Sequence, residues 1–77
     1  MNGVMYLKYI GRDNWDRPVY EDGDGILWKD VDPREDGNAE LCSALNNDFY
    51  GEPDTPMHAM ERYQGFLIVF VPGRDTW

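Results

Sequence analysis

The sequence has a single cysteine, Cys42, and a single histidine, His58, among its 77 residues. One cysteine cannot form a disulfide within the chain, and one cysteine with one histidine does not supply the four ligands of a structural zinc site. We therefore expect no disulfide, no metal site and no cofactor. A lone thiol is typical of a protein from the reducing cytoplasm.

Basic residues are also scarce. The chain has 7 Lys and Arg against 15 Asp and Glu, for a formal net charge of −8, and residues 20–54 hold 11 acidic and 2 basic residues. Such a region repels the phosphates of nucleic acid and attracts a basic protein surface. We expect no direct contact with nucleic acid. The charge is explained either by a basic protein partner or by solubility alone.

Long apolar runs are absent too. None approaches the roughly 18 residues needed to cross a bilayer, and the N-terminal residues lack the basic region and apolar core of a signal peptide. We expect no membrane association and no export. With 77 residues and no linker-like tract, the chain predicts a single domain, residues 1–77, with one small core.

The clearest positive signal is a predicted β-hairpin over residues 17–32. Two runs rich in β-branched and aromatic residues flank the turn DGDG at residues 22–25. The best cross-strand pairs come from a four-residue loop. Those pairs are Val19 with Trp28, Tyr20 with Leu27 and Arg17 with Asp30.

A first strand is predicted at residues 5–12, joined to the hairpin by a loop of residues 13–16. The expected pairs are Lys8 with Glu21, Tyr9 with Tyr20 and Ile10 with Val19. Alternate residues of a strand point to opposite sides, so Tyr20 and Leu27 face the core. Val19 and Trp28 then lie on a second face, which is either a binding patch or covered by residues 33–54.

Two further segments carry helix signals. Thr55-Pro56 is a typical helix start and Gly65 a typical stop, which predicts a helix on the core face of the sheet. Residues 39–45 predict either a short helix, closed by Asn46-Asn47, or a strand.

Residues 66–71, FLIVFV, are apolar at every position, which is typical of a strand buried on both faces. Such a strand belongs in the centre, beside the first strand. The sequence therefore predicts an α+β fold, an antiparallel four-stranded sheet in the order 3-2-1-4 with one or two short helices packed on one face. Residues 33–54 or a second copy would cover the other face.

No motif for catalysis is present. Counted from Asp22, the fifth position of a calcium loop would be Ile26 instead of Asp or Asn. The carboxylates lie on turns without an apolar pocket to raise their pKa, and His58 has no evident nucleophile to activate. We expect no catalytic residues and no enzyme.

The residues expected to contact a partner are acidic or aromatic. Carboxylates can occupy a basic groove in place of phosphates, and tryptophans are preferred interface anchors. These predicted partner-binding residues are Trp15, Glu21, Asp22, Asp24, Trp28, Asp30, Asp32, Glu35 and Asp36.

Three segments, YIGRDNWDRPVY, GILWKDVDP and NNDFYGEPDTP, resemble small domains of phages, plasmids and integrative elements of gut Firmicutes. They are similar in style to the large polyvalent protein-associated domains. The resemblance covers roughly residues 9–56. It implies a mobile-element accessory protein in the cytoplasm of a bacterial host, and it carries over no catalytic residues.

Two functions follow. The first is a non-catalytic acidic binding protein, such as an anti-CRISPR-like inhibitor of a host defence nuclease, which presents carboxylates to a basic nucleic-acid-binding groove. The alternative is a self-assembling or structural and regulatory domain. It would form a homodimer, or associate with a larger element-encoded protein, through FLIVFV and the apolar sheet face.

Overall fold

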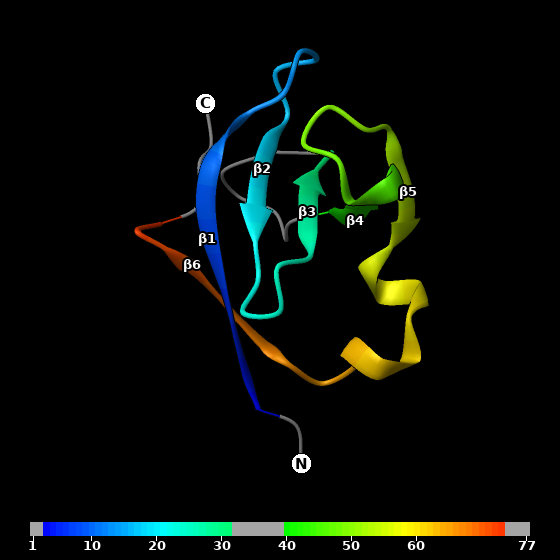
Figure 1. Ribbon diagram of the computed structural model, residues 1–77. Coiled ribbons are helices and arrows are strands. Elements are labelled where there is room, and N and C mark those ends of the chain that lie inside the picture. The colour runs from blue at the N-terminus through cyan, green and yellow to red at the C-terminus, as the bar shows by residue number, and fades with distance from the viewer. Residues whose placement is uncertain (1–2, 32–39, 74–77) are drawn as a thin grey trace.

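A computed structural model describes residues 3–31 and 40–73, which form one mixed β-sheet (Figure 1). Its strands are β1 (Val4–Arg12), β2 (Pro18–Glu21), β3 (Leu27–Asp30), β4 (Leu41–Ala44), β5 (Pro53–Pro56) and β6 (Leu67–Val71). The spatial order is β5-β4-β3-β2-β1-β6, antiparallel throughout except for the parallel pair β1–β6. The described residues also form three short 3₁₀ turns: η1 (Leu45–Asn47), η2 (Met57–Ala59) and η3 (Glu61–Tyr63).

The predicted α+β fold is therefore wrong, because the described residues form six strands and no α-helix. None of their helical turns is long and apolar enough to cross a membrane. Of the two alternatives for residues 39–45, the strand is observed, as β4.

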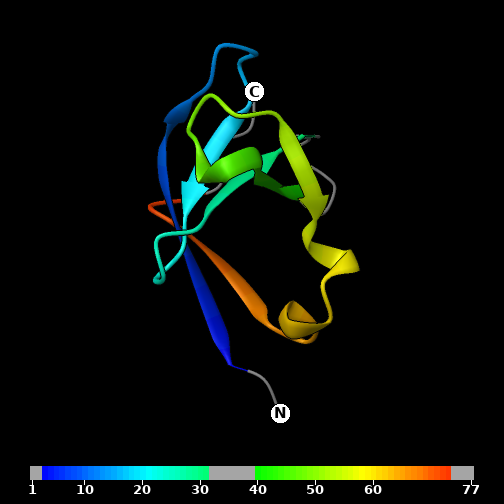
Figure 2. The ribbon, with the colours of Figure 1, turned by 45° about the vertical axis from the view of Figure 1, so that its right-hand side comes forward.

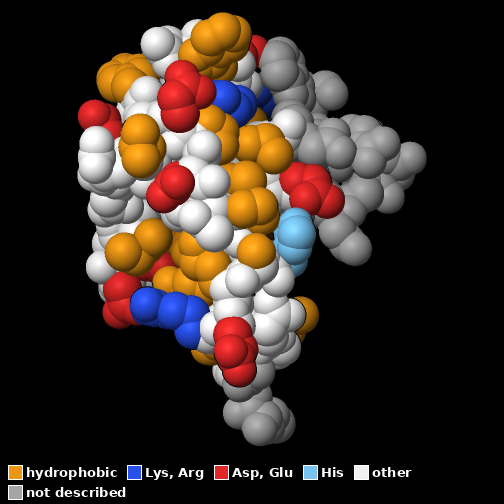
Figure 3. All heavy atoms as spheres, turned by 90° about the vertical axis from the view of Figure 1, so that its right-hand side faces the viewer, with side chains coloured by type: hydrophobic (Ala, Val, Ile, Leu, Met, Phe, Trp, Pro, Cys, Tyr) orange, Lys and Arg blue, Asp and Glu red, His pale blue; other side chains and the backbone are white. Residues whose placement is uncertain are grey.

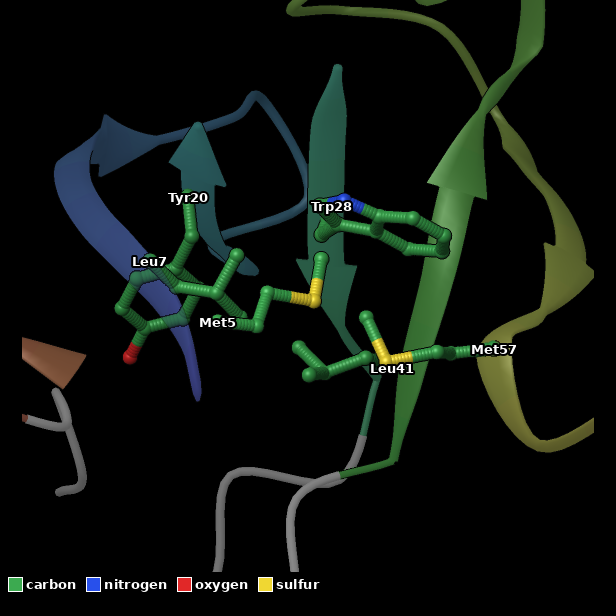
Figure 4. Packing of buried hydrophobic residues seen from close by; sticks show 6 residues of the cluster. All are labelled: Met5, Leu7, Tyr20, Trp28, Leu41 and Met57. Atoms are coloured by element: carbon green, nitrogen blue, oxygen red, sulfur yellow. The ribbon is translucent and has the colours of Figure 1, made fainter. Parts of the chain in front are cut away.

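The sheet curls so that strands far apart in its order share one core. The core cluster comprises Met5, Leu7, Tyr20, Trp28, Leu41 and Met57. The cluster therefore brings β1 into contact with η2, the turn that follows β5. Met5, Trp28, Leu41 and Met57 point toward one another (Figure 4). The η2–η3 segment leads the chain from β5 to the start of β6, at the other edge of the sheet (Figure 2).

The β2–β3 hairpin differs from the predicted register by one residue. Tyr20 lies opposite Trp28 and Val19 opposite Lys29, because the loop has five residues, 22–26, instead of four. A slip of one residue moves every side chain to the other face. Trp28 therefore faces the core with Tyr20, and Leu27 faces the second side with Val19.

The first hairpin matches the prediction near the core and departs from it at a bulge. The pairs Lys8 with Glu21 and Tyr9 with Tyr20 are confirmed, but Gly11 instead of Ile10 lies opposite Val19. Gly11 has φ 139°, and a Cβ there would lie 3.3 Å from the ring of Phe49. Glycine thus permits the bulge, which the pairing pattern alone did not reveal.

The second face of the hairpin is covered by the chain itself. Val19, Leu27 and Ala44 form a small cluster under Phe49, which lies in the loop between β4 and β5. Val19 is fully buried. The alternative of an open binding patch on this face is therefore wrong.

The helix predicted between Pro56 and Gly65 is also wrong. Residues 53–56 pair with β4 as β5, and the rest forms η2 and η3, separated by Met60 in an extended conformation (φ −100°, ψ 111°). A helix this short gains too few hydrogen bonds to repay its nucleation in water. The broken path instead lets both Met57 and Tyr63 reach the core cluster.

The strand over residues 66–71 lies beside β1, but it is parallel to β1 and stands at the edge of the described sheet. Ile68 and Phe70 pack against the core cluster, whereas Leu67 is 64% and Val71 42% exposed. The prediction of a central strand buried on both faces is wrong.

Candidate functional site

The tip of the β2–β3 hairpin is ordered by the side chain of Asp22. Its Oδ1 accepts hydrogen bonds from the backbone N–H groups of Asp24 (2.8 Å) and Ile26 (3.0 Å). Its Oδ2 accepts a bond from Nε1 of buried Trp28 (3.0 Å). Both oxygens are therefore engaged within the turn. The carboxylate of Asp24 is exposed and that of Glu21 half-buried, so these two present charge at the tip.

Asn47 in η1 clamps the same hairpin from the side. Its Oδ1 accepts a bond from the N–H of Leu27 (2.7 Å), and its Nδ2 donates to the carbonyl of Gly25 (2.9 Å). The backbone of Asn47 is left-handed, with φ 53°, a conformation that asparagine tolerates better than most residues. The loop before β5 therefore supports the acidic tip.

Asn47→Ala is expected to lower the free energy of unfolding by about 1–3 kcal/mol, because it leaves the N–H of Leu27 without a partner. Urea unfolding curves measure the loss. Asn46→Ala is the matched control: its φ is also left-handed, at 57°, and its side chain makes no hydrogen bond within the described residues. Equal losses in the two variants would show that the clamp contributes nothing.

A hollow lies beside the tip, between the start of β1 and the end of η3. Its volume is about 260 Å³, and its lining includes Val4, Tyr6, Asp22, Asp24, Tyr63 and Phe66. Aromatic rings and carboxylates thus meet in one concave surface, which we call the tip hollow. A ring face beside a negative charge suits a cationic side chain.

A buried ionic cluster lies on the other side of the sheet. The side chains of Asp13 and Lys29 are fully buried, and Nζ of Lys29 lies 2.6 Å from Oδ2 of Asp13. The same ammonium donates to the carbonyl of Phe49 (2.6 Å), and Nε of Arg17 donates to Asp13 (2.9 Å). The cluster joins the β1–β2 loop, β3 and the β4–β5 loop.

Asp13 is held as a carboxylate. Burial would raise its pKa, but hydrogen bonds from the Lys29 ammonium, the Arg17 side chain and the backbone N–H groups of Arg17 and Trp15 outweigh this. Together they lower the pKa of Asp13 to about 2. Because the Lys29 ammonium is buried and paired with the Asp13 carboxylate, it adds no positive charge to the surface.

The sequence alone does not reveal this cluster. Asp13 lies in the predicted loop of residues 13–16, and no role was predicted for Lys29. Lys29 directly follows the apolar residues Ile26, Leu27 and Trp28, but its counter-ion Asp13 lies 16 residues earlier in the chain.

The predicted partner-binding residues do not form one site. Glu21, Asp22 and Asp24 lie together at the β2–β3 turn. Trp15 is 68% exposed in the β1–β2 loop at the opposite end of β2 (Figure 1). Trp28 and Asp30 are fully buried, so neither can be a surface contact in this structure. Asp32, Glu35 and Asp36 lie outside the described residues.

Exposed charge among the described residues is strongly acidic. Two bases are exposed, Lys8 and Arg62. Seven acids are exposed, namely Asp16, Asp24, Glu40, Asp48, Glu52, Asp54 and Glu61. On the side shown in Figure 3, carboxylates lie at several separate places between apolar side chains, and bases lie only near its upper and lower ends.

Groups suited to metal or nucleophilic chemistry are not assembled in the described part of the chain. No three His, Cys, Asp or Glu side chains there converge to hold a metal ion. Burial raises the pKa of Cys42, and the charge of Glu40 raises it further. The thiol of Cys42 is therefore protonated at neutral pH, which makes it a weak nucleophile.

Comparisons with known protein families, curated proteins and solved structures find no match for this chain. The resemblance to mobile-element domains stays a hypothesis.

Proposed function

We propose that this protein is a non-catalytic acidic binding domain whose partner is a protein with a basic surface. The observation that carries the proposal is the imbalance of exposed charge. The described residues include seven exposed acidic side chains and two exposed basic side chains, and Lys29 is buried. A basic partner would be attracted at long range by this field. Direct binding of nucleic acid would be opposed by the same field.

The acidic tip and the tip hollow are the contact that we propose for this partner. Asp22 holds the turn in shape, so Asp24 and Glu21 can meet a Lys or Arg side chain without first ordering a loop. The rings of Tyr63 and Phe66 would lie along the stem of that side chain. Within the chain itself, the guanidinium of Arg62 lies 4.9 Å from the centroid of the Tyr63 ring, which is an example of a cation against this ring.

The specific form that we propose is an inhibitor of a host defence nuclease, encoded by a mobile element and acting in the bacterial cytoplasm. Its carboxylates would take the place of phosphates in a basic nucleic-acid-binding groove. The support is the acidic surface together with the sequence resemblance. Trp15, with the Arg17 guanidinium 5.9 Å from its ring centroid, is an exposed aromatic that offers a second anchor at the other end of the sheet.

The test reverses charge at the tip while leaving Asp22 in place. Glu21→Lys with Asp24→Lys is expected to weaken binding to a basic partner at least about tenfold, since like charges would then meet. The measurement is capture of proteins from a Firmicutes lysate on the immobilised domain. Elution of the captured protein by duplex DNA identifies a nucleic-acid-binding groove.

Glu40→Lys with Asp54→Lys is the control, because it changes the net charge equally at two exposed positions away from the tip. Equal capture by the two double variants would refute a specific role for the tip. Captured protein that DNA does not release would refute the nuclease-inhibitor form alone. No capture by the wild-type domain would count against the binding function itself.

A further inference from the structure

The tip hollow has a size that suits one side chain of a partner. Its volume of about 260 Å³ lies below the roughly 300–1,000 Å³ of sites for drug-sized ligands. Tyr6, Tyr63 and Phe66 supply aromatic rings to its lining, and Asp22 and Asp24 supply carboxylates. Tyr6 is 62% exposed, so solvent reaches this wall of the hollow. A side chain can therefore enter the hollow without a change in the fold.

Asp24 provides the free acceptor of the tip hollow. The carboxylate of Asp22 already accepts three hydrogen bonds, from the N–H groups of Asp24 and Ile26 and from Nε1 of Trp28. Asp24 is exposed, and no group in residues 3–31 and 40–73 donates to its carboxylate. Two carboxylate oxygens can accept two parallel bonds from one ligand. A ligand that suits Asp24 must bring positive charge and two donors.

Tyr6 provides the free ring. The ring of Tyr63 meets Trp28 edge to face at 5.0 Å and has the guanidinium of Arg62 at 4.9 Å. The ring of Tyr6, in contrast, has no other ring and no cation against it in the part of the chain that the structure describes. An exposed ring face attracts a cation. Tyr6 and Asp24 therefore offer a ring face and a pair of acceptors within one hollow.

Arginine uses this combination better than other cations. Its guanidinium is planar, stacks on an aromatic ring and donates two parallel N–H bonds to a carboxylate. The ammonium of lysine is a compact, strongly hydrated charge, and a quaternary ammonium has no N–H group to donate. The chain itself holds a guanidinium against a ring of the same hollow, that of Arg62 on Tyr63. Charge and geometry together select arginine.

We propose that the tip hollow recognises an arginine side chain of the basic partner. The guanidinium stacks on the ring of Tyr6 and donates to both oxygens of Asp24, and the apolar stem of the side chain lies against Phe66. This recognition rests on the proposed function, because it names the residue that the basic partner presents to the acidic tip. A lysine is attracted by the same charge but is bound less tightly.

The direct test is a titration of the isotope-labelled domain at constant ionic strength, followed through the backbone amide NMR signals of Gly23, Asp24 and Phe66. The probes are N-acetyl-arginine methylamide, N-acetyl-lysine methylamide and tetramethylammonium chloride. A single side chain at an open site binds weakly, with a dissociation constant on the order of millimolar. The arginine probe is expected to bind about two- to fivefold tighter than either other probe, which is the effect of an exposed cation–π contact. Equal or weaker binding of the arginine probe, or no shift of these signals, would overturn the proposal.

Two variants of Tyr6 test the role of its ring. Tyr6→Leu is expected to remove the preference for the arginine probe, whereas Tyr6→Phe should retain it, because only the second variant keeps a ring. Tyr50→Leu is the matched control, since Tyr50 is also 62% exposed but does not line the tip hollow. An unchanged preference in Tyr6→Leu, or an equal loss in Tyr50→Leu, would overturn the proposal.

Asp24→Asn tests the carboxylate without changing its shape. It is expected to weaken binding of the arginine probe about two- to fivefold, as for an exposed ion pair. Asp54→Asn, at an exposed position outside the tip hollow, should leave that binding unchanged. Equal effects of the two variants would overturn the proposal.

The probe titrations and the lysate capture can fail separately. Capture that depends on the tip charges, together with no preference for the arginine probe, would overturn the arginine recognition and leave the basic partner in place. A preference for the arginine probe without any capture from the lysate would support the recognition by the tip hollow and count against the proposed protein partner.

Discussion

Asp13→Asn is expected to lower the free energy of unfolding at pH 7 by about 3–5 kcal/mol. Replacing the carboxylate leaves the buried Lys29 ammonium with the Phe49 carbonyl but without a counter-ion, and it also removes the ion pair with Arg17. A domain of this size has little stability to lose. Urea unfolding followed by tryptophan fluorescence at pH 7 measures the loss.

Asp16→Asn is the matched control for this variant. Asp16 belongs to the same loop and lies 3.6 Å from Arg12, but its side chain is 54% exposed. An exposed pair contributes at most about 1 kcal/mol. Similar losses in Asp13→Asn and Asp16→Asn would show that burial of the Asp13 pair does not matter.

The effect of Asp13→Asn is also expected to depend on pH. The pKa of Asp13 is about 2 in the folded protein, against about 3.9 for an unfolded aspartate. A lowered pKa contributes stability above the unfolded pKa and loses it as the pH falls, here by about 2–3 kcal/mol between roughly pH 5 and pH 1. The gap between wild type and Asp13→Asn should therefore narrow from pH 7 to pH 3. A gap that stays constant would contradict the ionic role of Asp13.

Trp28→Ala is expected to cost about 3–5 kcal/mol. The side chain is fully buried, its ring meets Tyr63 edge to face at 5.0 Å, and Nε1 donates to Asp22. Truncation leaves a cavity in the core cluster and removes one of the bonds that hold the hairpin tip. Circular dichroism during urea unfolding is the suitable measurement, because it does not rely on the missing fluorophore.

Trp15→Ala provides the comparison, because Trp15 is 68% exposed. A surface substitution of this kind usually changes stability by no more than about 0.5 kcal/mol. Trp28→Phe separates two contributions, since it keeps most of the apolar contact and removes the Nε1 donor. A larger loss for Trp15→Ala than for Trp28→Ala would contradict the burial of Trp28 in the core cluster.

Short-range features were readable from the sequence. The DGDG turn predicted a hairpin, and the pairs Lys8 with Glu21 and Tyr9 with Tyr20 follow from matching side chains across a short loop. These pairs depend only on neighbours in the chain. The position of residues 66–71 beside the first strand was also predicted, but for a central antiparallel strand, whereas β6 is parallel to β1 and lies at the edge of the described sheet.

The register of the β2–β3 hairpin was not readable, because a side chain decides it. Asp22 accepts bonds from two backbone N–H groups of the loop and from Trp28, and a five-residue loop satisfies all three. The four-residue loop was preferred because it paired Val19 with Trp28. The slip of one residue then moved Trp28 from the second face of the hairpin to the core face.

Composition and local turns determined that this protein is small, acidic and built around a hairpin with a charged tip. Only the tertiary structure decided which acidic side chains are exposed and can contact a partner. Asp22 is engaged by the turn, Asp13 is buried against Lys29, and Asp24 remains exposed. It also decided that the most apolar strand stands at the edge of the described sheet. The reason is that burial and ion pairing depend on contacts between residues distant in the chain, which neither composition nor local periodicity specifies.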